Sequence, residues 1–413
     1  MAAQVYVLGG WQSDFGHNWA RSGRDLFDVF RDTVHAGFAA TELAPQDVEV
    51  AHVGNFAAEI FCGQGHLGGF FAASDAQLAG VPASRHEAAC ASGSIAALCA
   101  AADIESGRYG LAAVVGIEQM RNVSGDQAAA NIGGTAMWNG HECQNVKYPW
   151  PHMFSLLADE YDQRYGIRHE HLARIAQINF ANARRNPNAQ TRKWAFNDLS
   201  FTNDDHENPV IDGRIRKQDC GQITDGAAIV FLASAERASH YARKHGRTLE
   251  SIPHIRGWGH RTAPISYSAK IEASREAEYV FPHVRGTITD AFRRAGIGSV
   301  DELDAIETHD CFTTTEYMAI DHFGITAPGE SWKAIENRDI EIGGRIPVNP
   351  SGGLIGLGHP VGATGVRMLL DSYKQCTATA GDYQVPGAST VATLNIGGSA
   401  TTTVSFIVST AAA

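Results

Sequence analysis

Residues 90–117 read CASGSIAALCAAADIESGRYGLAAVVGI. The first part, Cys90–Ile104, would place small and apolar side chains on nearly all sides of a helix, so we expect this helix to be buried. Leu111–Ile117 is a short, continuous apolar run, which is typical of a buried strand. A buried helix followed by a buried strand indicates βαβ units and a layered α/β architecture.

The same alternation continues on both sides of this stretch, and it contains a weak internal repeat. Residues 33–56 and 287–312 both read as a helix, a turn, an acidic residue, a strand and a loop that ends in Phe. Each copy is followed by a Gly- and Ser-rich segment that opens an apolar helix. The sequence therefore predicts two similar halves. Other expected elements are strands at Val5–Leu8, Val48–Val53 and Ala227–Ala233, and a helix at Asp25–Ala39.

The middle of the chain has a different character. It holds most of the Asn residues and the paired-charge segments, with amphipathic helices expected at Met153–Tyr165 and His169–Arg185. We interpret it as a partly helical loop domain inserted into the first half. The predicted boundaries are 1–120 with about 228–250 for the first half, 121–227 for the insertion and 251–413 for the second half.

Composition and charge exclude several classes of function. The chain has 413 residues with 44% hydrophobic and 19% charged residues, which is ordinary for a globular enzyme. Its formal charge is 33 − 45 = −12, which would repel a nucleic-acid backbone. No apolar stretch approaches membrane length, and we expect the first residues to form a strand rather than a signal peptide. Seven cysteines without a C-x-x-C pair favour a reducing compartment, so we expect a cytoplasmic protein.

Cys90 is the first candidate for chemistry. It is expected where the chain passes from a loop into a helix, and there the unpaired N–H groups and the helix dipole stabilise a thiolate. Such a position can lower a thiol pKa from about 8.5 to about 3.5–7.5. Cys90 is therefore a candidate nucleophile, and the alternative is a small buried thiol in the core, a common role for cysteine.

Three further motifs lie late in the chain. His359 stands in the glycine-rich loop GLGHPVGATG, where it would activate a nucleophile or donate to an oxyanion, unless it is incidental to a glycine turn. His309 and Cys311 follow an expected strand at Leu303–Ile306 and share one side of the extended chain. A metal site would need another ligand nearby, so an acid/base thiol beside an imidazole fits better. The glycines of NIGGS, residues 395–399, predict close approach to a ligand.

Taken together and in this order, the motifs resemble the thiolase family over essentially the whole chain. The nucleophile segment Cys-x-Ser-Gly is matched by Cys90–Gly93, the histidine of Gly-His-Pro by His359, and a late Gly-Gly motif by Gly397 and Gly398. Two departures resemble the sterol-carrier-protein-type thiolases. His309-Asp310-Cys311-Phe312 replaces the usual Asn-Glu-Ala-Phe, and Asn395 replaces the usual second cysteine.

The resemblance implies a thiolase fold, with two similar βαβαβαββ halves forming a layered αβαβα core. It implies an acyltransferase that cleaves a 3-ketoacyl-CoA, or runs the reverse Claisen condensation, through an acyl-enzyme. Coenzyme A is expected as a co-substrate, with no tightly bound cofactor and no metal. The implied catalytic residues are Cys90, His309, Cys311 and His359, the oxyanion donors are the N–H groups of Cys90 and Gly398, and the possible substrate-loop residues are Gly358, Asn395 and Gly397.

The insertion is expected to bind CoA and to set the acyl-chain specificity. Its positive charges gather at Arg184, Arg185, Arg192 and Lys193, which are either phosphate contacts or a solvated helix face. Its large apolar residues wall the pocket or belong to the ordinary core: Trp138, Tyr148, Trp150, Met153 and Phe154.

Several alternatives remain open at the level of sequence. Thiolases of this type imply a homodimer or tetramer, and relatives of the subfamily suggest a small OB-fold partner subunit. Within such a complex the chain could transfer acyl groups to a non-CoA carbon acceptor or act as a retro-aldol lyase, although lyase chemistry needs no acyl-enzyme and leaves Cys90 without a role. A non-catalytic acyl-CoA- or lipid-binding protein is the alternative of another class, and it leaves four retained reactive residues unexplained.

Overall fold

The central feature of the computed structural model, which describes residues 4–410, is a nine-stranded sheet with the order β3-β2-β4-β7-β1-β8-β11-β10-β9. Residues 1–3 and 411–413, the outer ends of the two predicted halves, lie outside the described part. The strands are β1 (Val5–Gln12), β2 (Val50–Gly54), β3 (Ala83–His86), β4 (Leu111–Glu118), β7 (Gly226–Ser234), β8 (His254–Thr262), β9 (Ala305–Thr308), β10 (Thr390–Gly397) and β11 (Thr402–Ser409).

The sheet divides into two similar parts between β1 and β8, which are paired only at Val5 with Ile255 and at Tyr6 with His254. In the first part β2 and β4 are parallel, and β4–β7 and β7–β1 are antiparallel. In the second part β9–β10, β10–β11 and β11–β8 repeat that order and those directions. Even the edge is repeated, because Val348 pairs in parallel with Ile306 at the place that β3 has beside β2. This confirms the two predicted halves.

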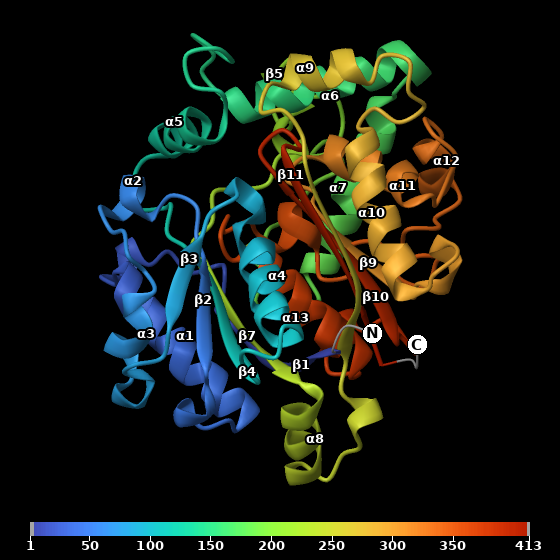
Figure 1. Ribbon diagram of the computed structural model, residues 1–413. Coiled ribbons are helices and arrows are strands. Elements are labelled where there is room, and N and C mark those ends of the chain that lie inside the picture. Colours follow the sequence, from blue (N-terminus) through green and yellow to red (C-terminus); the bar gives the residue numbers. More distant parts are fainter. Residues whose placement is uncertain (1–3, 411–413) are drawn as a thin grey trace.

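Helices form three layers around the two parts of the sheet (Figure 1). α4 (Ser92–Glu105) and α13 (Thr364–Cys376) pack against each other in the middle, with α4 on β2 and β4 and α13 on β10 and β7. α1 (Leu26–Thr41) covers the outer face of the first part, and α10 (Pro282–Ala295) that of the second. The predicted αβαβα layering is confirmed. The remaining helices of these halves are α2 (Ala58–Cys62), α3 (Gly69–Ser74), α8 (Ala235–Lys244), α9 (Tyr267–Ala273), α11 (Thr313–Phe323) and α12 (Ser331–Glu336).

Most predicted elements are present with shifted ends. The strand predicted at Leu303–Ile306 begins two residues later, at Ala305. Leu303 instead ends a short turn of 3-10 helix, Val300–Glu302. The helix predicted at Asp25–Ala39 begins after Asp25, whose carboxylate accepts the Asp28 N–H and caps the helix.

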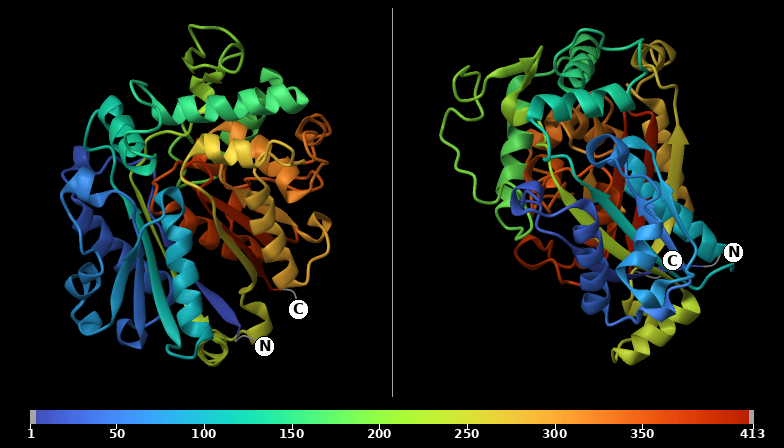
Figure 2. Two further views of the ribbon diagram at one scale, coloured as in Figure 1. Left: turned by 45° about the horizontal axis from the view of Figure 1, so that its top comes forward. Right: turned by 90° about the vertical axis from the view of Figure 1, so that its left-hand side faces the viewer.

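The insertion between β4 and β7 lies over one end of the two halves (Figure 2). It contains α5 (Gly125–Ala136), α6 (Pro149–Tyr165), α7 (His169–Ala183) and a hairpin of β5 (Val210–Asp212) and β6 (Ile215–Arg216). Its two ends are fastened together by Asp225, whose carboxylate accepts the N–H groups of Met120 and Arg121, both at 2.8 Å. The boundaries at 121 and 227 stay predictions, and they fall close to the end of β4 and the start of β7.

Among the helices of residues 4–410, none is both long enough and apolar enough to cross a lipid bilayer.

Candidate functional site

Four loops carry the predicted catalytic and oxyanion residues to one place. Cys90 lies in a 3-10 turn, Ala89–Ala91, directly before α4. His309 and Cys311 directly follow β9. His359 lies between a π-helical turn, Gly353–Leu357, and the start of α13. Gly398 is in the tight turn between β10 and β11, with a φ of +64° that favours glycine.

The reactive atoms are close together. Cys90 Sγ and one ring nitrogen each of His309 and His359 all lie within 4.8 Å of one another. The two imidazole rings are perpendicular, with centroids 5.1 Å apart. Cys311 lines the same pocket as Cys90 and His359. Cys, His and His are also metal ligands, so the absence of a metal stays a prediction.

The pocket beside these residues has a cavity volume of about 150 Å³ and mostly apolar walls. Of the five large residues predicted as walls or core, Tyr148, Trp150 and Phe154 line it. Met153 is buried in the core, and Trp138 is 45% exposed and does not line the pocket. Cys220, which is not among the predicted catalytic residues, also lines the pocket.

The expected lowering of the Cys90 pKa is wrong. Burial raises the pKa of the Cys90 thiol to about 12, although the N–H groups of Gly398 and of Cys90 itself bond to the sulfur and oppose the rise. Desolvation penalises the thiolate more than these two dipoles stabilise it. Burial also lowers the pKa of His359 to about 3, with Arg367 as a second cause. The resting pair is therefore a neutral thiol beside a neutral imidazole.

These pKa values predict how Cys90 reacts with iodoacetamide. Because the thiol pKa lies far above neutrality, the thiolate fraction and the alkylation rate should keep rising from about pH 5.5 to about pH 9. The rate is measured by mass spectrometry of the peptide that contains Cys90. A thiolate–imidazolium pair would instead give a rate that is constant over this range, and that result would contradict the neutral resting state.

Cys311 is equally buried. Burial raises the pKa of its thiol well above the usual value, with the neighbouring Cys90 as the next cause, while the Thr315 side chain bonds to the sulfur and lowers the pKa. Burial, followed by the neighbouring His359, lowers the pKa of His309 well below its usual value. The site therefore holds two protonated thiols and two uncharged rings in one desolvated space.

The three predicted substrate-loop residues do not form the surface of the pocket. Gly358, Asn395 and Gly397 are not among the residues that line the pocket, whereas Gly398 is. A β-carbon on Gly397 would come within 2.2 Å of the Ala88 carbonyl oxygen, so this glycine lets β10 approach the Cys90 turn. Asn395 instead contacts His309, with its amide nitrogen 3.1 Å from the ring Nδ1. Their role as substrate contacts stays a prediction.

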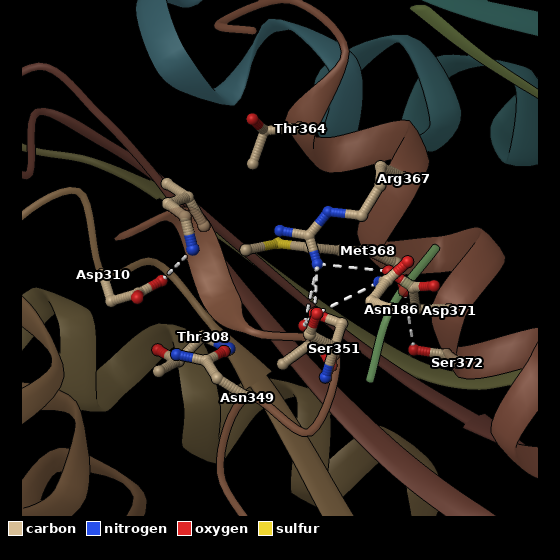
Figure 3. Close-up of polar contacts among 12 residues, drawn as sticks. Asn186, Thr308, Asp310, Asn349, Ser351, Thr364, Arg367, Met368, Asp371 and Ser372 are labelled. Carbon is tan, nitrogen blue, oxygen red and sulfur yellow. Dashed lines mark hydrogen bonds and ion pairs between the residues drawn. The ribbon is translucent and has the colours of Figure 1, made fainter. Parts of the chain in front are cut away.

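A buried ionic network centred on Arg367 connects the elements next to the two histidine loops, and Figure 3 shows Arg367 with Ser351 and Asp371. Arg367, in α13, pairs with Glu307 of β9 at 2.7 Å and with Asp371 at 3.2 Å, and all three side chains are fully buried. Its guanidinium also donates to Ser351 Oγ. Arg367 thus joins α13, which follows His359, to β9, which precedes His309. Asp371 is four residues further along α13, but Glu307 and Ser351 lie on other elements, so the sequence did not mark this arginine as the centre of a network.

Arg367→Met should destabilise the fold by about 3–5 kcal/mol, because it leaves the buried Glu307 carboxylate without its cation and Asp371 with Lys374 as its cation. The free energy of unfolding is measured by urea denaturation. Lys374→Met is the matched control, since Lys374 also contacts Asp371, at 3.4 Å, but from a partly exposed position. It should cost less than about 1 kcal/mol. Equal losses for the two variants would contradict the assigned role of Arg367.

The four basic residues predicted to bind CoA line a different pocket, which shares no residue with that of Cys90. Arg192 is held by Asp14 through two hydrogen bonds, at 2.8 and 2.6 Å, and Arg184 donates to the Trp194 carbonyl. Arg185 and Lys193 lie in the same pocket beside Lys374. The role of these residues in binding phosphates stays a prediction.

Comparisons with known proteins agree with this geometry. Residues 5–199 match the family model "Thiolase, N-terminal domain", and residues 266–410 match "Thiolase C-terminal domain-like". The acetyl-CoA acetyltransferase of Methanothermobacter thermautotrophicus is 31% identical over 397 residues, which cover 95% of this chain and 96% of that protein. Sterol carrier protein 2 of Rattus norvegicus is 26% identical over 95% of this chain and 70% of its own length. The solved structure of an Ltp2-ChsH2(DUF35) aldolase has the same fold, with a TM-score of 0.76 at 20% identity, and the match covers 98% of this chain and 97% of that one.

Proposed function

The chain belongs to the thiolase family, and from this premise we propose that it cleaves a 3-ketoacyl-CoA with CoA, or runs the reverse Claisen condensation, through an acyl group on Cys90. The observation that carries the proposal is the meeting of Cys90, Cys311 and the uncharged His359 in one apolar pocket, with the uncharged His309 within 4.8 Å of Cys90 and His359. All seven cysteines are free, which supports the reducing, cytoplasmic compartment predicted from the sequence.

In the first step, His359 takes the proton of the Cys90 thiol while the sulfur attacks the 3-keto carbon. The neutral pair makes this transfer possible without a stored thiolate. The negative charge that develops on the former keto oxygen is accepted by the backbone N–H groups of Cys90 and Gly398. Both N–H groups belong to fixed backbone turns beside Cys90, the 3-10 turn of Cys90 itself and the turn after β10.

In the second step, the bond between carbons 2 and 3 breaks, and its electron pair forms the enolate of acetyl-CoA. His309 and His359 lie where they can stabilise the enolate oxygen. Cys311 gives its proton to carbon 2, and the first product leaves. The Cys311 thiolate then takes the proton of an incoming CoA thiol, whose sulfur attacks the acyl-enzyme. Cys90 is released as a thiolate and recovers its proton from His359, so the cycle balances.

A retro-aldol lyase is the second candidate, because one structural neighbour is named as an aldolase. Aldol cleavage needs a base but no nucleophile, so it gives no role to Cys90, whose Sγ lies within 4.8 Å of a ring nitrogen of each histidine. We therefore place acyl transfer first. A homodimer or tetramer and an OB-fold partner subunit belong to the same proposal.

The test is to mix the purified chain with acetoacetyl-CoA and CoA and to follow the loss of the 3-ketothioester. A parallel reaction offers a 3-hydroxyacyl-CoA and monitors release of the carbonyl fragment. Thiolysis without aldol cleavage is the expected result. Aldol cleavage without thiolysis would replace the first candidate with the second. If neither reaction occurs and acetyl-CoA does not acylate Cys90, the proposed chemistry is wrong.

A further inference from the structure

The two histidines beside Cys90 are held by different partners, and each uses Nδ1 for that contact. His359 Nδ1 lies 2.7 Å from Thr364 Oγ1, and His309 Nδ1 lies 3.1 Å from Asn395 Nδ2. Nε2 is therefore the ring nitrogen that each histidine has left for Cys90 and the reactants. Because both rings are uncharged, each carries one proton, and its partner decides which nitrogen holds it.

The partner of His309 is a donor. Ser94 Oγ donates to Asn395 Oδ1 at 2.8 Å, which turns the other end of the amide, the NH₂ group, toward His309. The surroundings favour this orientation, because the amide oxygen faces the positive N-terminal turns of two helices. Ser94 is in the first turn of α4, and a β-carbon on Gly365, in the first turn of α13, would lie 2.6 Å from Oδ1. An amide NH₂ only donates, so Nδ1 of His309 must be bare and its proton must be on Nε2.

The partner of His359 is an acceptor. Thr364 Oγ1 donates to the Pro360 carbonyl at 3.2 Å, as a threonine in the first turn of a helix commonly does. The hydroxyl oxygen is then free to accept the Nδ1–H of His359. This leaves Nε2 of His359 without a proton. That nitrogen is buried and has no partner among the residues that the structure describes.

We propose that Asn395, fixed by Ser94, and Thr364 act as positioning residues that set opposite tautomers on the two histidines. His359 presents a bare Nε2 that accepts the Cys90 proton, whereas His309 presents an Nε2–H that donates to the substrate oxygen. The catalytic meaning of this arrangement rests on the proposed function, since only a reaction with both a proton acceptor and an oxyanion donor needs the two forms together.

Nitrogen-15 NMR of labelled histidines in the full resting chain tests the tautomers directly. Signals of the two rings are assigned by their loss in His309→Gln and His359→Gln. We expect a protonated Nε2 on His309 and a protonated Nδ1 on His359. The same tautomer on both rings would overturn the proposal. This readout needs no turnover, so if acetoacetyl-CoA is not cleaved while opposite tautomers are present, the proposed function fails and the tautomer assignment stands.

Variants then test the consequence for catalysis. Asn395→Asp places a pure acceptor beside His309, draws the proton onto Nδ1 and should lower kcat about 10²–10³-fold, with a much smaller change in KM. Alkylation of Cys90 should be unchanged, because His359 is untouched. Thr364→Val should slow Cys90 alkylation and lower kcat together. If Asn395→Asp leaves the His309 tautomer and kcat unchanged, Asn395 does not position this ring.

A second pair of variants tests the same role of Asn395 without introducing the buried charge of Asn395→Asp. Ser94→Ala retains Asn395 but releases its amide, so it should give a mixture of His309 tautomers and an intermediate kcat. Ser405→Ala is the matched control, because Ser405 is a buried serine of β11 opposite Leu394, the neighbour of Asn395. It should leave both the tautomers and kcat as they are. A loss of kcat in Ser405→Ala equal to that in Ser94→Ala would show a packing effect and overturn the proposal.

Discussion

Replacing Cys90 by Ala should lower kcat for thiolysis of acetoacetyl-CoA more than about 10⁴-fold, because Cys90 is the one thiol among the described residues whose sulfur lies within 4.8 Å of ring nitrogens of both His309 and His359. The variant should also take up no acetyl group from acetyl-CoA, which mass spectrometry of the intact protein reports. Cys90→Ser keeps the side-chain volume but has a far more weakly acidic group, so it should be nearly as inactive.

The matched control for this prediction is Cys99→Ala. Cys99 lies on α4, the helix that begins directly after the Cys90 turn, and it is partly buried, but it does not line the pocket. Its replacement should leave both turnover and acylation intact. If Cys90→Ala retained turnover, the acyl-enzyme would be excluded and base-catalysed aldol cleavage would become the better explanation of the site.

The residues of the site were predictable from sequence where a motif carries them on a short, distinctive loop. Cys90, His309, Cys311 and His359 each stand in such a loop, and the order of the loops led to the family resemblance. The supporting residues were not found, because their partners are remote along the chain. Ser94 and Asn395 are 301 positions apart, and Arg367 is 60 positions from Glu307. Only the folded chain brings such pairs together.

The chemistry of Cys90 shows why local reasoning failed on the pKa. The sequence correctly places this residue at a helix start, but the N–H groups that lower its pKa are its own and that of Gly398, in the turn after β10, rather than those of the α4 first turn. What the sequence cannot supply is the degree of burial, which depends on three further loops closing over the turn. The architecture was easier to predict. The repeat in residues 33–56 and 287–312 indicates two similar halves, and each half of the sheet has the same strand order. The ends of strands depend on hydrogen bonds to other parts of the fold. The start of β9 therefore differs by two residues from the start predicted from the sequence.

Replacing Cys311 by Ala should separate the two thiols by role. General acid–base catalysis contributes about 10²–10⁴-fold, and we expect kcat for thiolysis to fall by about 10³-fold. Acetylation of Cys90 by acetyl-CoA should persist, because that step uses His359 and the N–H groups of Cys90 and Gly398. The two cysteine variants would then differ in acylation although both are poor in turnover.

A second readout isolates the proton that Cys311 moves. In deuterated water, the methyl group of acetyl-CoA should exchange its hydrogens with solvent on the unaltered chain, since Cys311 adds and removes a proton at carbon 2. Cys311→Ala should abolish this exchange. Cys220→Ala is the control, because Cys220 lines the same pocket and its neighbour Gly221 donates its N–H to the Cys311 carbonyl at 2.8 Å. Exchange that persisted in Cys311→Ala would move the acid/base role to His309 or His359, and Cys311 would then serve only to shape the pocket.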